Sequence, residues 1–343
     1  MQNSTRARLL IAALIIAGSL VLAFTLARPR MAEPTASTAV PERSIPAADV
    51  ATLAHAPHLL IRHAGTDANY NHLSVAPIAE PNARRATTSL ECERLSFGGG
   101  RGLCLQADRG VFTTYRAVIF DDQFKVVHSM KLDGSPTRTR VSRDGRVGAM
   151  TVFVSGQKHG YASSSFSTKT TIVDLASGDD LGQLEQFTTW RDGQRFSAKD
   201  FNFWGVTFTS NSNIFYASLK TAGQTYLVRG ELGLRKLTVL HQNVECPAVS
   251  PDDRLIAYKK RVGGNLAPWR FYVLDVATMR ERPIAGEKRS IDDQLEWFDD
   301  RHVLYSARRS SQSAVLDVWI AAVDSDEPAR EFVVQADSPI VVR

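Results

Sequence analysis

The chain has 343 residues, an apolar content of 43% and a formal net charge of +5. Residues 1–43 hold five of the arginines and only two acidic residues, which leaves 36 basic and 34 acidic residues in the rest of the chain. Because nucleic-acid binding needs a concentrated basic face, this nearly neutral remainder argues against a nucleic-acid partner.

The N-terminus has the pattern of a targeting segment. Arg6 and Arg8 precede an uncharged apolar run over residues 9–27, nineteen residues, long enough for a helix to cross about 30 Å of hydrocarbon. The sequence TLA at 25–27 also permits signal cleavage. We therefore expect residues 1–27 to be a signal-anchor or a signal peptide, with a buried core helix as the remaining alternative.

An uncleaved anchor would place the protein in the cell membrane as a single-pass protein with its folded domain outside the cytoplasm, whereas cleavage would secrete it. Residues 28–54 follow, and most of this stretch is rich in Pro, Ala, Ser and Thr with few large apolar side chains. That composition cannot form a packed core, so it predicts a flexible spacer. The folded domain is expected over residues 55–343.

The folded domain shows a repeat of short β-strands. Alternating or β-branched runs are separated by Gly, Asp, Asn and Ser, which is typical of all-β proteins. A repeat of four expected strands in about 40–50 residues is the signature of a propeller blade. In this chain, extra loops are expected at 155–166 and 187–200. Each unit has a tight turn between its first two strands, and these turns are expected near Gly99, Asp144, Asn211, Asp252 and Asp299.

The number of blades follows from the two ends of the repeat region. Residues 338–343 have the pattern of an innermost strand without the rest of its blade, and residues 58–88 supply three strands without an innermost one. Joining them completes six blades and leaves no open edge. The sequence therefore predicts an all-β fold: a monomeric six-bladed β-propeller with four-stranded blades, closed by the C-terminal strand and preceded by an N-terminal hydrophobic helix.

The repeat resembles that of TolB-like propellers, through SPDDRLIAY at 250–258 followed by VLDV at 273–276. The likeness to TolB-like exported or membrane-anchored proteins of actinobacteria is closer and rests on CPAVSPDD (246–253), YKKR (258–261), DDQLEW (292–297), DVW (317–319) and SPIVV (338–342). It covers about residues 55–343. TolB itself has an additional α/β domain before its propeller, for which residues 28–54 are too few, so the Tol–Pal partnership is not carried over.

Three cysteines are present, Cys92, Cys104 and Cys246, without a CxxC motif or a Cys/His cluster. This pattern argues against a metal site and against thioredoxin-like chemistry. In an exported domain, Cys92 and Cys104 could pair across one hairpin, while Cys246 lies in a different blade. The alternative is three buried cysteines that pack as small apolar residues.

The sequence contains no catalytic motif. The G-x-S-x-G and H-E-x-x-H motifs, the phosphate-binding loop and the dinucleotide-binding glycines are absent. Paired aspartates are distributed over several blades, where most mark turns, and the histidines at 55, 58, 63 and 72 lack a metal-binding spacing. We therefore predict no cofactor, no metal and no enzyme activity.

Two regions are candidates for binding. The connections between blades surround the central opening of a propeller, and here they carry residues suited to a small polar ligand or a peptide terminus: Arg138, Asp200, Asn202, Glu245, Asp292, Asp293 and Gln294. The alternative is a water-filled structural channel. The loops 155–166 and 187–200 are expected on the same face, with Tyr161, Trp190 and Arg191 as residue types that anchor protein partners, or else as ordinary loop variation. Residues 259–261, two lysines and an arginine, are expected to be solvated edge charge.

These observations favour a non-catalytic cell-envelope propeller that acts as a binding scaffold or sensor. Its partner would be an envelope protein, a peptide or a cell-wall ligand bound at the channel face. The alternative is a propeller hydrolase or lyase with its active site at the channel mouth. The two hypotheses differ in whether catalytic side chains converge inside the channel.

Overall fold

The computed structural model describes residues 43–154, 166–264 and 266–343. Every element given below belongs to one compact unit, Glu42–Arg343. Within the described ranges, no helix is long and apolar enough to cross a membrane. The predicted targeting segment and Tyr161 lie outside the described residues.

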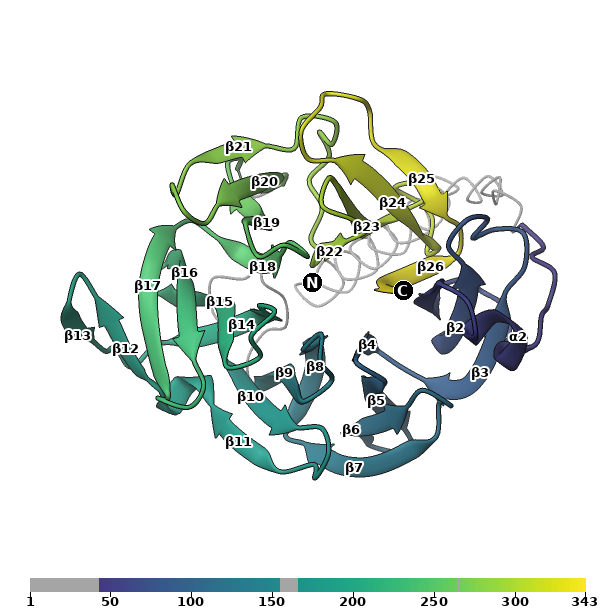
Figure 1. The fold of residues 1–343 in the computed structure, drawn as a ribbon, viewed down its shortest axis with the longest axis horizontal. Coiled ribbons are helices and arrows are strands. Elements are labelled where there is room, and N and C mark those ends of the chain that lie inside the picture. The colour runs from purple at the N-terminus through teal and green to yellow at the C-terminus, as the bar shows by residue number, and fades with distance from the viewer. Residues whose placement is uncertain (1–42, 155–165, 265) are drawn as a thin grey trace, which may run out of the picture. The chain divides into compact units, whose positions relative to one another are not determined.

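Six sheets surround a central axis and form a ring (Figure 1). From the axis outward, blade 1 consists of β26 (Ala336–Val342), β1 (His58–His63), β2 (His72–Pro77) and β3 (Ala86–Glu91). Blade 2 consists of β4 (Arg94–Gly98), β5 (Arg101–Arg109), β6 (Thr113–Asp121) and β7 (Val126–Leu132). Blade 3 consists of β8 (Gly134–Val141), β9 (Val147–Val154), β10 (Thr168–Asp174) and β11 (Asp180–Gln183).

The remaining blades follow the same order. Blade 4 consists of β14 (Asn202–Phe208), β15 (Ile214–Thr221), β16 (Gln224–Glu231) and β17 (Lys236–Gln242), followed outside by β12 (Thr188–Arg191) and β13 (Gln194–Phe196). Blade 5 consists of β18 (Glu245–Val249), β19 (Leu255–Arg261), β20 (Trp269–Asp275) and β21 (Glu281–Pro283). Blade 6 consists of β22 (Glu296–Trp297), β23 (His302–Arg308), β24 (Leu316–Ala322) and β25 (Arg330–Val333). Among the residues that the structure describes, two short helices complete the unit, α2 (Val50–Ala54) and η1 (Leu184–Gln186).

The predicted ring closure is confirmed. β26 pairs antiparallel with β1, and Ile340 lies opposite Leu60 while Ala336 lies opposite His63. Both faces of β1 are buried, and Leu60 has no exposed surface. The last strand of the chain therefore supplies the innermost strand of the first blade, so the ring has no open edge there.

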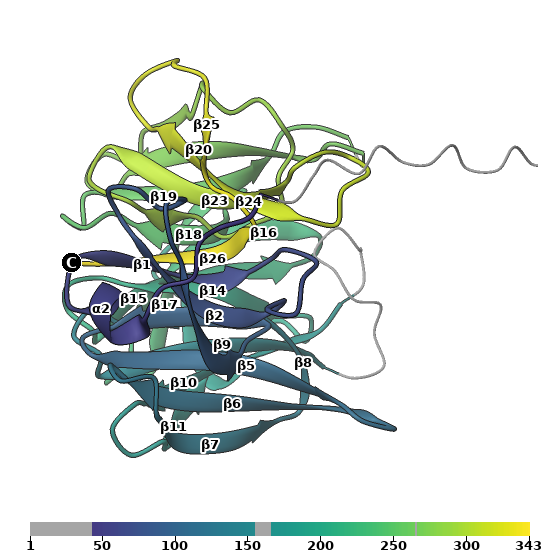
Figure 2. The same cartoon turned by 90° about the vertical axis from the view of Figure 1, so that its right-hand side faces the viewer.

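The short turns between first and second strands lie at the predicted positions, and two of them share one hydrogen-bond pattern. The Ser250 hydroxyl donates to Asp252 Oδ1 (2.6 Å) and accepts from the Leu255 N–H (2.9 Å). Ser142 and Asp144 repeat both contacts in blade 3. We call the face that carries these turns the short-turn face. The opposite face, which carries the connections between second and third strands and between blades, is the loop face. Figure 2 shows the ring from its edge, with the C-terminus at the short-turn face.

Glycine permits close contact between the turns of blades 2 and 3. Gly99 has a φ of +53°, and a Cβ atom there would lie 2.2 Å from the carbonyl carbon of Asp144. A Cβ on Gly145 would in turn lie 2.6 Å from the Gly99 oxygen. Neither turn could carry a side chain at these positions without moving its neighbour.

Two segments differ from the predictions. Residues 43–54, expected to belong to a flexible spacer, are folded: Ala47 forms a bridge with Arg85, and Leu53 of α2 is buried against blade 1. The segment 187–200, expected to be a loop, forms the β12–β13 hairpin, in which β12 pairs parallel with β17. The outermost strand of blade 4 offered an unpaired edge, and this hairpin satisfies its backbone groups.

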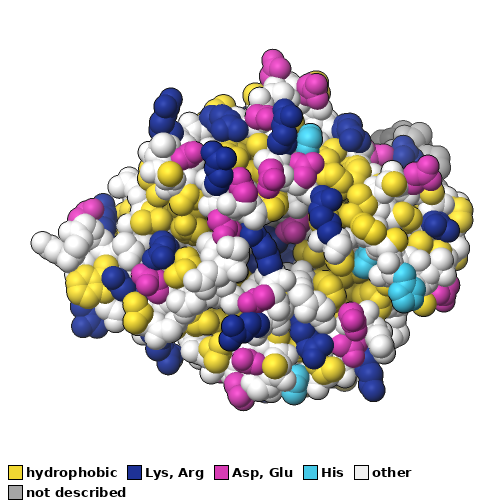
Figure 3. Space-filling view, in the orientation of Figure 1, with side chains coloured by type: hydrophobic (Ala, Val, Ile, Leu, Met, Phe, Trp, Pro, Cys, Tyr) yellow, Lys and Arg dark blue, Asp and Glu magenta, His cyan; other side chains and the backbone are white. Residues whose placement is uncertain are grey.

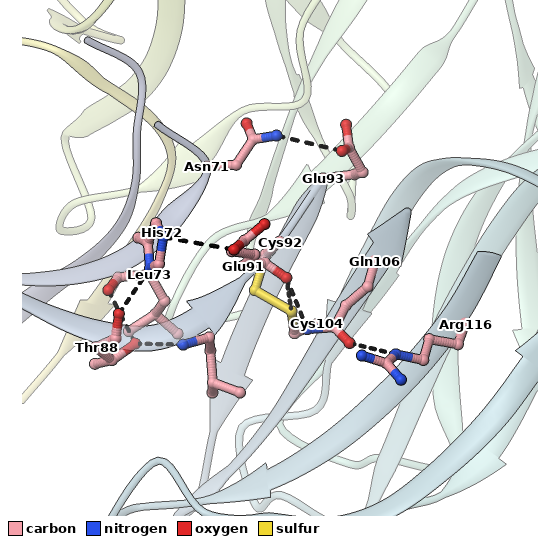
Figure 4. Close-up of a disulfide and its surroundings, with 11 residues drawn as sticks. Asn71, His72, Leu73, Thr88, Glu91, Cys92, Glu93, Cys104, Gln106 and Arg116 are labelled. Atoms are coloured by element: carbon pink, nitrogen blue, oxygen red, sulfur yellow. Dashed lines mark hydrogen bonds and ion pairs between the residues drawn. A yellow bond between two sulfur atoms is a disulfide. The ribbon is translucent and has the colours of Figure 1, made fainter. Parts of the chain in front are cut away.

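Cys92 and Cys104 form a disulfide, with 2.08 Å between the sulfur atoms (Figure 4). The pairing agrees with the prediction, but Cys92 lies in the connection from blade 1 to blade 2 and not in a strand of the hairpin. The bond therefore joins this connection to β5. Cys246 is buried in blade 5 and is a free thiol, as expected for a cysteine in another blade.

Candidate functional site

Six charged side chains narrow the axial channel near the loop face. We call them the plug: Arg62, Arg94, Arg138, Asp292, Asp293 and Asp337. Asp337 is buried and accepts hydrogen bonds from Arg62 Nε (3.0 Å) and Arg94 Nη1 (3.2 Å). Burial would raise the pKa of Asp337, but the two guanidinium groups outweigh it and hold that pKa far below its ordinary value.

Asp292 forms the second ionic contact of the plug. Its carboxylate pairs with the Lys259 ammonium and lies 3.4 Å from Arg138 Nη2. Burial would raise the pKa of Asp292, but the two cations lower it. Lys259, expected to be solvated, is fully buried, with its Nζ 4.6 Å from the centre of the Trp269 ring. The expectation was wrong because this second strand faces the neighbouring blade connection that carries Asp292.

Asp293 differs from its neighbour. Burial and the nearby Asp337 carboxylate raise its pKa, and its Oδ2 accepts the Ser306 N–H at 2.8 Å. Beside Asp293, Arg94 and Arg138 the channel contains a cavity of only about 30 Å³, which is room for roughly one water molecule. The plug is therefore a charge network, paired within itself and to Lys259, with little space for a ligand.

A cavity of about 500 Å³, which we call the funnel, opens on the short-turn face. All six innermost strands contribute to it, and its largest apolar residues are Phe97, Phe208, Trp297 and Phe298. Figure 3 shows this face hollowed at the centre of the ring, with Lys or Arg and Asp or Glu side chains around the hollow. The channel therefore offers its space on the face opposite the predicted one, because the plug fills the end at the loop face.

Arg140 and Glu296 lie where the funnel meets the narrow part of the channel, since both cavities include them. Their side chains form an ion pair, and Arg140 Nη2 also donates to the Leu295 carbonyl (3.0 Å). Burial raises the pKa of Glu296, although Arg140 opposes that rise. The floor of the funnel is thus polar, whereas its walls are largely apolar.

Arg143 fixes one side of the funnel's rim. Its guanidinium donates to the carbonyls of Ser250 (2.5 Å) and Pro251 (2.6 Å), and it lies 3.2 Å from Asp253. Asp253 in turn accepts the Ser210 N–H (2.9 Å). These bonds tie the turns of blades 3, 4 and 5 together, so this side of the rim is preorganised.

The structure brings together only part of the predicted site. Arg138, Asp292 and Asp293 meet in the plug, and Gln294 lies beside them, donating to the Val206 carbonyl (3.3 Å). Glu245 is buried, 3.8 Å from Arg261.

The other two predicted residues have structural contacts. Asp200 accepts the Thr221 hydroxyl and the Ala222 N–H, both at 2.6 Å, so it caps a turn. Asn202 Oδ1 accepts the Thr168 N–H (2.8 Å) and joins blades 3 and 4.

The predicted partner-binding residues of segment 187–200 lie away from the channel. Trp190 and Arg191 belong to β12, at the outer edge of blade 4 (Figure 1). The Lys236 Nζ lies 5.9 Å from the centre of the Trp190 ring, and the Arg191 guanidinium lies 5.2 Å from the centre of the Tyr226 ring. Strand pairing to β17 holds both residues at the rim of the disc.

Sequence reasoning missed Arg62, Arg94, Arg140, Glu296 and Asp337. One signal was available: Arg140 stands in the predicted innermost strand, two residues after Arg138 in the connection before it, and alternate residues of a strand share a face. Arg62 gave no such signal, because it lies in a second strand and reaches the channel only through its long side chain.

Within the described ranges, no group of three or more His, Cys, Asp and Glu side chains could hold a metal ion. The funnel combines apolar walls with paired polar side chains at its floor and rim.

Comparisons with known proteins concern the fold. No family model matches the chain, and no curated protein matches it. Among solved structures, TolB from Acinetobacter baumannii is similar, with a TM-score of 0.57 and 14% identity over 83% of this chain and 66% of that one, just under two thirds of its length. A chain of the nidogen/laminin complex has a TM-score of 0.56 and 11% identity over 83% of this chain and 98% of that one. At such identities the likeness shows the fold alone, and the chain therefore has a TolB-like six-bladed β-propeller fold.

Proposed function

We propose that the protein is a non-catalytic binding scaffold or sensor of the cell envelope, which holds a segment of an envelope protein, a peptide or a cell-wall fragment in the funnel. The funnel is the observation that carries this proposal, because its volume of about 500 Å³ falls in the range of ligand sites, roughly 300–1,000 Å³. The Cys92–Cys104 disulfide supports an oxidising compartment outside the cytoplasm.

The residues of the funnel define the chemistry of its ligand. Phe97, Phe208 and Trp297 favour an apolar group, and the indole N–H of Trp297 is already bonded to the Ala248 carbonyl (2.8 Å). Arg140 and Arg143 already pair with Glu296 and Asp253, so they contribute polar N–H groups and little net charge to the funnel. We therefore expect a ligand with an apolar part and a hydrogen-bonding polar group.

The test is capture from a cell-envelope extract by immobilised protein, comparing variants that differ in one feature. In Arg140→Gln/Glu296→Gln the ion pair is removed as a unit, so no buried charge is left alone. In Phe298→Ala one wall of the funnel is removed. Both variants should retain the fold and recover at least tenfold less of the captured material, which corresponds to about 1.4 kcal/mol.

Trp190→Ala, for the rim of the ring, and Gln294→Ala, for the loop face, serve as controls. If these variants lose capture and the funnel variants do not, the binding site lies where the sequence predicted it. Recovery of the ligand in cleaved or otherwise altered form would instead support the alternative hydrolase or lyase.

A further inference from the structure

The exposed apolar side chains of the ring are concentrated on one face. Nine large apolar side chains are exposed among the described residues, and one of them, Leu234, lies on the short-turn face. Val126 and Val127 lie on the outer strand of blade 2. The other six lie at the loop face, in connections between second and third strands or at the end of a second strand: Tyr70, Val111, Phe112, Val154, Val262 and Leu266.

The β5–β6 hairpin presents the most prominent of these residues. Val111 and Phe112 form its tip and are 95% and 84% exposed. β5 and β6 are nine residues each, against five in β4, so the hairpin extends past the rest of its blade (Figure 2). Strand pairing continues to the last pair, Arg109 with Thr113, and the disulfide at Cys104 ties β5 to the neighbouring connection. The tip is therefore held out into solvent by ordered structure.

A second tip lies across the ring, on blade 5. Leu266 is fully exposed and Val262 is half exposed, in the connection from β19 to β20. Tyr70 on blade 1 adds a third point. Isolated exposed apolar residues are ordinary, but three separated apolar tips on one face match a flat apolar surface better than a single groove on a protein partner.

We propose that the loop face docks on a lipid bilayer, with Phe112 and Leu266 entering its interfacial region. The proposal takes the predicted segment 1–27 as an uncleaved signal-anchor rather than a signal peptide; fifteen residues then separate its apolar run, 9–27, from the first described residue. An extended chain of that length reaches at most about 50 Å, which keeps the propeller close to the bilayer. Aromatic and aliphatic tips with a tyrosine at the water boundary are the residue types that bilayer interfaces accept.

Charge contributes little to this contact. Arg109 pairs with Glu93 (2.6 Å), and Arg261 lies 3.8 Å from Glu245. These two cations thus have acidic partners, so we take apolar insertion as the attraction and expect neutral lipid to suffice. Docking in this orientation leaves the funnel, on the opposite face, open to the aqueous compartment.

The experiment reports on single positions in the full chain reconstituted into phosphatidylcholine vesicles. Phe112→Cys, Leu266→Cys and, as the short-turn-face control, Leu234→Cys are labelled with an environment-sensitive fluorophore; the native cysteines are a disulfide pair and a buried thiol. We expect the labels at 112 and 266 to shift to shorter emission wavelength and to be quenched at least twofold more by spin-labelled lipid than the label at 234. Equal quenching at the three positions overturns the proposal.

A second measurement removes the tip from the folded unit 42–343, which contains the complete ring and its cores. Val111→Ser/Phe112→Ser should lower sedimentation with phosphatidylcholine vesicles at least tenfold, while Arg140→Gln/Glu296→Gln leaves it unchanged. Binding that requires phosphatidylglycerol and disappears at high salt, or a fluorescence change that requires an envelope protein extract, would overturn lipid docking. Ligand capture by the funnel should be the same in the tip variant as in the parent. The experiments can therefore contradict lipid docking without contradicting the proposed function, and the reverse.

Discussion

At the scale of single residues, burial decides what a charged side chain contributes. Lys259 and Lys260 are neighbours in β19, yet the Lys259 side chain is fully buried against Asp292 and Trp269, whereas Lys260 is partly exposed beside Glu281. Lys259→Met should therefore cost about 2 kcal/mol in the free energy of unfolding, because Asp292 loses a buried partner and keeps only Arg138. Lys260→Met should cost less than about 1 kcal/mol. Denaturant unfolding measures both, and equal losses would contradict this assignment.

Glu185 in η1 provides a test by pH. Burial raises its pKa to about 7, although its carboxylate accepts the Thr170 N–H (3.1 Å). Because this pKa is higher in the folded than in the unfolded chain, protonated Glu185 favours the folded state. Its contribution to the free energy of unfolding is complete below pH 4.5 and is lost as the pH rises towards 7. As the pH rises from 5 to 8, the free energy of unfolding of Glu185→Gln should therefore increase by about 2 kcal/mol relative to that of the parent. Thermal unfolding at both pH values checks this, with the exposed Glu80→Gln as the matched control. A gain independent of pH would contradict it.

At the scale of elements, β26 carries the closure of the ring. Its removal exposes the inner edge of β1 and the buried residues Leu59, Leu60 and Ile61. Deleting residues 338–343 should lower the melting temperature strongly, because the loss is comparable with the whole stability of a domain, on the order of 5–15 kcal/mol. Arg343→Ala, which changes only the exposed last residue, should have a small effect. An unchanged melting temperature in the deletion would show that closure does not depend on this strand.

At the scale of the whole molecule, the two faces of the disc have different surfaces. The short-turn face carries the funnel, whose rim is held by hydrogen bonds between turns. The loop face carries the apolar tips of blades 1, 2 and 5. The plug separates the two mouths of the channel, since its charges pair with one another and leave a cavity of about 30 Å³. A propeller of this kind can contact different partners on its two faces without a passage between them.

The sequence by itself determined the blades and their closure. Turns such as 250–255 are built from residues that are close in the chain, and the alternation of side chains along a strand has a period of two. Both signals are local, so the sequence alone reveals them. The same reasoning placed Cys92 near Cys104, twelve residues apart.

The channel could not be predicted in this way. Arg138 and Asp292 are 154 positions apart, and Arg62 and Asp337 are 275 apart. Once six blades are closed around one axis, the reach of each long side chain decides which charged residues meet. It also decides which mouth of the channel they fill. The tertiary structure alone therefore decided that the loop-face mouth is filled by paired charge and that the open cavity lies on the short-turn face.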